Sequence, residues 1–146
     1  MIALLLTTLL RLAGVFIIVL GALHFFLPAL LNFKAALLQR PAGWQYPRPF
    51  RVWPTTYKTK PTDMLGVVWV MNHAASYALV SIGAVDLFAT AWLRTGDGRW
   101  LAWWIAGFWA LRAATQLTFG RRSGDWLILA WFAALGALHV LAAVVR

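Results

Sequence analysis

Long apolar segments separated by short polar ones dominate this chain of 146 residues. About 20 apolar residues are enough to cross the hydrocarbon core of a bilayer as an α-helix. The pattern predicts four such spans, over residues 12–31, 65–93, 100–119 and 126–145. Because the connections after the second and third spans are short, neighbouring helices are expected to run antiparallel. The sequence therefore predicts an all-α polytopic membrane protein, a single domain built as an antiparallel bundle of four transmembrane helices.

The first span begins after Arg11, whose long side chain can reach the membrane surface from the end of a helix. Gly14 and Gly21 lie seven residues apart, close to one helix face, and predict that another helix approaches closely there. Pro28 is expected to kink or end the helix.

Residues 32–63 form one long connection with a composition of its own. Its five prolines exclude a regular membrane-spanning helix. Basic residues mixed with Trp and Tyr are typical of a membrane–water interface. We expect residues 33–39 to form a short amphipathic helix on that surface. We interpret the connection as a segment that contacts anionic lipid headgroups; a cap over the helices or a docking surface for a partner is the alternative.

The charged residues predict an orientation in the membrane. The net charge is +9, but the cations lie mainly between apolar spans, where they set topology or meet lipid headgroups, so no nucleic-acid partner is expected. We expect the 32–63 connection on the cytoplasmic side of a bacterial inner membrane, because Lys and Arg are more numerous on the side of this connection. Both termini are then expected on the outer side. The cytoplasmic set is Lys34, Arg40, Arg48, Arg51, Lys58, Lys60, Arg121 and Arg122; the outer set is Arg94, Arg99 and Arg146.

The absence of cysteine excludes disulfide, thiolate and iron–sulfur chemistry. With only four acidic residues, a mechanism that needs paired carboxylates has little to work with. A Ser–His–Asp site can be assembled from Ser76 or Ser81, but neither serine lies in a nucleophile-elbow pattern. Our default expectation is therefore a protein that is not an enzyme.

Polar residues inside the predicted spans are the candidates for specific function, because such groups are costly in hydrocarbon. Counted from the span ends at about 1.5 Å per residue, they form two layers. The inner layer comprises His24, Asn72, His73, Arg112 and Gln116, and the outer layer comprises Asp86 and His139. Arg112 needs a counter-charge, and we predict an intramembrane pair with Asp86, either as a structural ion pair or as part of a substrate or proton path. No metal site is expected, since His139 lies in a different layer from the other two histidines.

We interpret the inner layer as polar anchors for an apolar ligand, a lipid or a quinone, inside an integral membrane binding or accessory subunit. Partner helices from other membrane subunits or a homo-oligomer are the other occupants considered. The predicted ligand-binding residues are His24, Asn72, His73, Tyr77, Arg112 and Gln116.

Two further functions use the same residues. His24 and His73 at matched depth predict, as an alternative, axial ligands of haem b in a redox subunit that also uses quinone. The other alternative is a small transporter or channel with a polar path gated by Asp86 and Arg112.

Residues 10–28, with the sequence LRLAGVFIIVLGALHFFLP, resemble the first helix of DoxX-like small bacterial membrane proteins. That family commonly shows an arginine, glycine-spaced apolar residues, a Gly-x-x-His-Phe segment and a proline, and its layout of four short-looped helices is similar. The resemblance covers one helix and the layout, and the long basic connection departs from it. It implies fold and location; a quinone-linked activity is associated with DoxX itself, but no motif here carries redox residues across.

Overall fold

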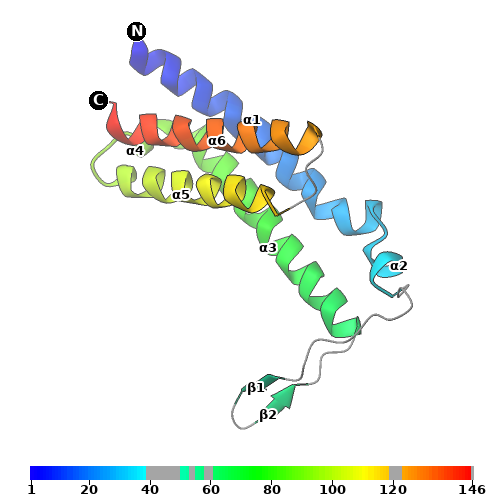
Figure 1. The fold of residues 1–146 in the computed structure, drawn as a ribbon. Helices are drawn as coiled ribbons and strands as arrows, with labels where there is room; N and C mark the ends of the chain where they lie inside the picture. The colour runs from blue at the N-terminus through cyan, green and yellow to red at the C-terminus, as the bar shows by residue number, and fades with distance from the viewer. Residues whose placement is uncertain (39–49, 53–54, 58–60, 119–122, 146) are drawn as a thin grey trace. The chain divides into compact units, whose positions relative to one another are not determined.

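A computed structural model describes residues 1–38, 50–52, 55–57, 61–118 and 123–145 (Figure 1). The described residues are mostly helical, and three helices, Ile2–Leu30, Met64–Phe88 and Gly124–Val144, are long and apolar enough to cross a membrane. They indicate a membrane protein. The elements in chain order are α1 (Ile2–Leu30), α2 (Phe33–Leu38), β1 (Phe50–Val52), β2 (Thr55–Tyr57), α3 (Pro61–Phe88), α4 (Thr90–Leu93), α5 (Gly98–Gln116) and α6 (Ser123–Val144).

The chain divides into two compact units. The first unit comprises Met1–Ile18 with Ser81–Arg146, and the second unit comprises Val19–Val80. Helices α1 and α3 therefore contribute residues to both units. Each unit contains its own polar cluster, and each is described separately below.

The helix bounds correct several sequence predictions. Helix α1 begins at Ile2, ten residues before the predicted 12–31 span, and it continues past Pro28 to Leu30. The predicted 65–93 span is not one helix, because α3 ends at Phe88 and Ala89 leaves the helical region with φ −119° and ψ 21° before α4. The predicted span 126–145 corresponds closely to α6.

The predicted 100–119 span corresponds to α5, Gly98–Gln116, which has 19 residues. This helix is not among the three apolar enough to cross a membrane by composition. Its apolar sequence is interrupted by Arg99, Arg112 and Gln116 and is rich in tryptophan.

Asn32 ends α1 and starts α2. Its φ of 46° lies in the left-handed region, where Asn is tolerated and commonly terminates a helix. Its side-chain Oδ1 then accepts a hydrogen bond from the backbone N–H of Ala35 (3.3 Å), as an N-cap residue does. The short helix predicted at 33–39 is confirmed as α2, Phe33–Leu38.

The all-α fold class is confirmed by the described helices, and one short β-hairpin that the sequence did not predict lies within the 32–63 connection. Strands β1 and β2 pair antiparallel, with Phe50 opposite Tyr57 and Val52 opposite Thr55. A two-stranded sheet suits a proline-rich segment, because proline removes helical hydrogen bonds and leaves the chain extended. The rest of the connection predicted to contact lipid headgroups lies mainly outside the described residues.

Glycines bring α1 and α3 into close contact in both units. In the first unit, a Cβ on Gly14 would lie 2.7 Å from the Gly83 carbonyl oxygen and 2.9 Å from the Leu87 nitrogen. In the second unit, a Cβ on Gly21 would lie 2.9 Å from Val80 Cγ2 and 3.0 Å from its nitrogen. The close helix approach predicted at Gly14 and Gly21 is therefore confirmed.

Helices α5 and α6 lie side by side and run in opposite directions (Figure 1). Trp109 of α5 is fully buried against Phe132 of α6, with ring centroids 5.5 Å apart, and contacts α6 again at Gly136. The turn before α5 is held by Thr95, whose Oγ1 donates to the Trp92 carbonyl (2.7 Å) and accepts from the Gly98 N–H (3.2 Å).

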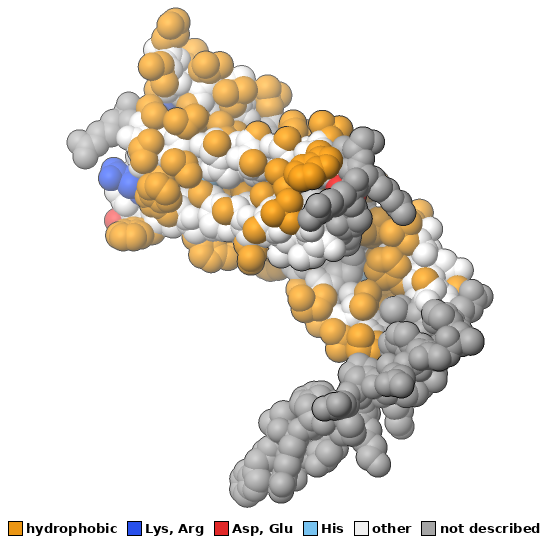
Figure 2. Space-filling view, viewed as in Figure 1, with side chains coloured by type: hydrophobic (Ala, Val, Ile, Leu, Met, Phe, Trp, Pro, Cys, Tyr) orange, Lys and Arg blue, Asp and Glu red, His pale blue; other side chains and the backbone are white. Residues whose placement is uncertain are grey.

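Hydrophobic side chains are spread along α1, α5 and α6 on the face seen in Figure 2. Many large apolar residues of these helices are solvent-exposed, for example Leu4 (73%), Leu111 (64%) and Leu127 (74%). Such extensive apolar exposure is unusual for a soluble monomer and suits helices that face lipid.

Candidate functional site

The polar cluster of the second unit joins α1 to α3. Asn72 of α3 donates from Nδ2 to the backbone carbonyl of His24 on α1 (2.9 Å). Ser76 Oγ donates to the Asn72 carbonyl (2.8 Å) and lies 3.4 Å from His24 Nδ1. Because the Ser76 proton is already used, His24 Nδ1 is the donor in that last contact. Asn72 and Ser76 are buried, so this network holds polar groups inside an apolar helix pair.

His73 lies beside this network but among aromatic rings. Its imidazole stacks on Phe25 with ring centroids 4.4 Å apart and meets Trp69 edge-on at 5.2 Å. Its Nε2 is buried and has no hydrogen-bond partner among the described residues. His24 and His73 thus have different surroundings, and their use as a pair of haem ligands stays a prediction.

An apolar groove opens between α1 and α3 next to the polar cluster. Its volume is about 370 Å³, within the range of small-ligand pockets. Ser76 and Tyr77 bring the two hydroxyl groups of its wall, and Ser76 joins the groove to the network of His24 and Asn72. The lining residues are Gly21, Ala22, Phe25, Phe26, Ser76, Tyr77 and Val80.

Tyr77 is the most exposed polar group of this groove. Its side chain is 77% exposed, and it lies near the middle of the span Met64–Phe88. At about 1.5 Å per residue, both span ends are roughly 17–20 Å away. In a helix that crosses a bilayer, a phenol hydroxyl at this position has no water within reach and needs an acceptor from a ligand, a lipid or another helix.

A buried acid–base pair lies in the first unit. Asp86 of α3 and His139 of α6 are both 0% exposed, and Asp86 Oδ1 lies 2.9 Å from His139 Nε2. The other imidazole nitrogen, Nδ1, lies 2.8 Å from the Leu135 carbonyl. The sequence placed Asp86 and His139 in one layer, and the structure joins them. The structure pairs Asp86 with His139, and no ion pair between Asp86 and Arg112 is present among the described residues.

Arg112 instead lies with its guanidinium carbon 5.2 Å from the ring centroid of Phe132, as in a cation–π contact. The face of an aromatic ring and the membrane surface can both accommodate the charge of Arg112. Arg112 therefore does not require the Asp86 carboxylate as a counter-charge. Gln116, one turn further along α5, donates from Nε2 to Asp125 Oδ1 (3.2 Å). Arg112 and Gln116 belong to the first unit, so four of the six predicted ligand residues, His24, Asn72, His73 and Tyr77, share the second unit.

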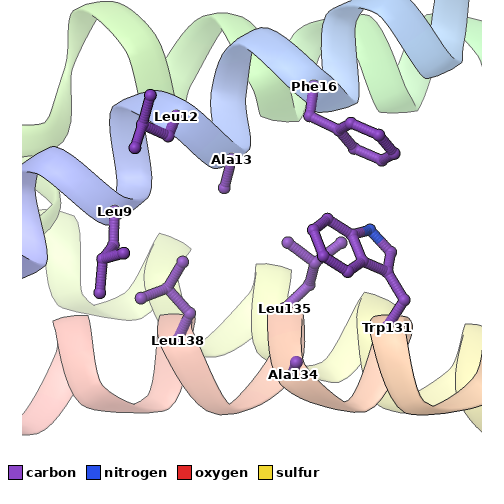
Figure 3. Close-up of a pocket in the computed structure, with 8 residues that line it drawn as sticks. All are labelled: Leu9, Leu12, Ala13, Phe16, Trp131, Ala134, Leu135 and Leu138. Atoms are coloured by element: carbon purple, nitrogen blue, oxygen red, sulfur yellow. The ribbon is translucent and has the colours of Figure 1, made fainter.

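A second apolar cleft lies in the first unit, between α1 and α6 (Figure 3). Its volume is about 290 Å³ and all its lining side chains are hydrophobic. Phe16 and Trp131 close one end with an edge-to-face contact of 4.9 Å between ring centroids. The indole N–H of Trp131 is the one polar side-chain group among the lining residues, and none of them carries a hydroxyl or a charge. Its lining residues are Leu9, Leu12, Ala13, Phe16, Trp131, Ala134, Leu135 and Leu138.

Comparison of the chain with protein-family models, characterised proteins and solved structures found no match. The resemblance of residues 10–28 to DoxX-like proteins therefore stays a prediction.

Ser76, Asp86 and His139 were considered from the sequence, but two of the contacts that they form were missed. Ser76 links the polar network to the groove, and its spacing of four residues after Asn72 was a usable signal, because residues four apart share a helix face. The hydrogen bond between Asp86 and His139 was also missed, although the sequence already placed both residues at equal depth in the second and fourth predicted spans.

Proposed function

We propose that this chain is an integral membrane binding or accessory subunit that holds a carbonyl-bearing apolar ligand, a quinone or an acyl lipid, in the groove beside Tyr77. The observation that carries the proposal is the exposed Tyr77, which lies near the middle of a candidate membrane span and at the wall of an apolar groove. A ligand carbonyl would accept the hydrogen bond that hydrocarbon cannot accept.

The remaining walls suit the same ligand class. Phe25 and Phe26 offer aromatic surface for a quinone ring, which prefers offset or edge-to-face contacts. Ser76 is held by Asn72 and His24, so the polar side of the groove is fixed before a ligand arrives. The tail of the ligand would extend into the surrounding lipid.

The proposal is tested by adding a short-tailed quinone to the purified protein and measuring its binding through the quenching of tryptophan fluorescence. We expect saturable binding that weakens roughly fivefold in Tyr77→Phe, because one hydrogen bond of about 1 kcal/mol is lost. Ala22→Trp is expected to fill the groove and to lower affinity by more than about tenfold. A brominated phospholipid in the same assay distinguishes an acyl lipid from a quinone as the preferred ligand.

Leu23→Trp is the matched control, because Leu23 neighbours Ala22 in sequence, is 57% exposed and does not line the groove. It is expected to bind like the wild type. Equal affinity for both probes in wild type, Tyr77→Phe and Ala22→Trp would rule out this groove as the site.

The membrane arrangement is part of the same proposal. We place the protein in a bacterial cytoplasmic membrane as four antiparallel spans, with α5 as the additional one. The 19 residues of α5 rise about 28 Å, close to the roughly 30 Å of hydrocarbon, and Arg99 near its start can reach the surface. The excess of Lys and Arg on the 32–63 side supports a cytoplasmic location for that connection.

Single cysteines test this orientation, because the chain has none of its own. Lys34→Cys in α2 and Gly96→Cys in the turn before α5 are both at exposed positions. In intact cells, we expect an impermeant thiol reagent to label the cysteine at 96 and to leave the one at 34 unlabelled until the membrane is opened. The reverse labelling pattern would invert the topology, and labelling of both positions would contradict the four-span arrangement.

A further inference from the structure

We propose that Asp86 and His139 form a proton-binding site within the first unit, where one exchangeable proton is held between Asp86 Oδ1 and His139 Nε2. This proposal is independent of the ligand groove, which belongs to the second unit.

The hydrogen bonds fix how many protons the pair carries. The Leu135 carbonyl can only accept, so His139 Nδ1, 2.8 Å away, must carry a proton. The 2.9 Å contact between Nε2 and Asp86 Oδ1 needs a second proton, which lies either on the imidazole or on the carboxyl. In both arrangements the pair is neutral overall. Removing that proton leaves a carboxylate facing a nitrogen lone pair, with a net charge of −1.

Burial makes this pair an expensive structural element. Both side chains are 0% exposed, and Asp86 Oδ2 has no hydrogen-bond partner among the described residues. A buried ion pair is often no more stabilising than apolar residues of similar size, and an unsatisfied buried oxygen adds a further cost. Ionisable groups inside membrane spans commonly mark proton or substrate paths. We assign proton exchange to Oδ2, because this carboxyl oxygen forms no hydrogen bond among the described residues.

No Lys or Arg side chain in the described part of the chain supplies a positive charge to the Asp86 carboxylate in place of that proton. Arg112 lies over Phe132, and Arg94 donates to the Ala3 carbonyl (3.3 Å). His139 is the one partner that forms an ion pair with Asp86 among the described residues. The other charged side chains on the elements of this unit are Arg11 on α1, Asp97 in the turn before α5, Arg99 on α5 and Asp125 on α6. Uptake of one proton therefore changes the net charge of the Asp86–His139 pair from −1 to zero.

Infrared difference spectroscopy of the full chain in phosphatidylcholine vesicles tests the proposal, with carboxyl-¹³C aspartate as the label. As the pH is varied, we expect one step in which the ¹³C-sensitive carboxyl band and the imidazole bands change together, with one proton taken up per chain. The step should be absent in Asp86→Asn and retained in Asp97→Asn, whose aspartate is exposed. A step that persists in Asp86→Asn would overturn the proposal.

A second variant covers the case in which Asp86→Asn does not fold. Replacing Asp63, Asp97 and Asp125 together by Asn leaves Asp86 as the only aspartate of the chain. The ¹³C-sensitive carboxyl change must then come from Asp86. Spectra that stay unchanged over the whole pH range in both the wild type and this variant would identify a fixed structural pair and refute proton exchange.

Discussion

Replacement of Gly14 by leucine is expected to force α1 and α3 apart and to lower the free energy of unfolding by about 3 kcal/mol. Even a Cβ at this position would lie 2.7 Å from the Gly83 carbonyl oxygen, 2.9 Å from the Leu87 nitrogen and 2.9 Å from Asp86 Cβ. Two of these three atoms are backbone, so rotation of a flexible side chain cannot relieve the overlap. The loss of stability is measured by unfolding the protein in mixed micelles with an increasing fraction of dodecyl sulfate and recording the helix content by circular dichroism.

Gly107 provides the matched control for this substitution. It lies within α5, is exposed, and an added Cβ would meet nothing within 4 Å. Gly107→Leu is expected to stabilise the protein slightly, by up to about 1 kcal/mol, because leucine is a better helix former than glycine. If Gly14→Leu unfolds at the same detergent fraction as the wild type, the close α1–α3 contact does not exist in the membrane protein.

His139→Leu is expected to cost about 3–5 kcal/mol, because it leaves the Asp86 carboxyl buried without its partner. Asp86→Asn should cost less, about 1 kcal/mol, because the amide NH₂ can still donate to Nε2 of a neutral imidazole. The same denaturation experiment measures both variants. A loss in His139→Leu no larger than that in Asp86→Asn would contradict the buried pair.

The double variant separates charge from packing. In Asp86→Asn/His139→Leu the remaining polar group is a neutral amide, so the double variant should be more stable than His139→Leu alone. Simple addition of the two single effects would mean that the side chains do not interact.

The sequence predicted the helices better than their ends. Residue spacing identified Gly14 and Gly21 as sites of close approach, because two glycines on one face have few other uses in an apolar helix. The helix break at Ala89 was missed because alanine favours the helix and no glycine or proline beside it indicates the change in φ and ψ. The β-hairpin was missed because hydrogen bonds between two short strands depend on contacts that periodicity does not report.

Depth in the membrane predicted part of the candidate site. Equal depth correctly placed Asp86 and His139 in one layer. Since a buried arginine was expected to need a counter-charge, Arg112 was instead predicted as the partner of Asp86, but Arg112 lies over Phe132. An arginine has several ways to satisfy its charge, including an aromatic face, and sequence alone does not rank them. The groove at Tyr77 depends on which side of α3 is left uncovered, and that depends on tertiary packing.

The length of α1 has a consequence for the membrane itself. Its 29 residues rise about 44 Å, whereas the 22 residues of α6 rise about 33 Å, and a typical hydrocarbon core is about 30 Å thick. The left-handed backbone of Asn32 ends α1 before α2 begins. Helix α1 must therefore tilt, extend into the headgroups or thicken the bilayer around it. Tilt and extension into the headgroups accommodate the excess length in a bilayer of ordinary thickness, and only local thickening would favour a thicker membrane.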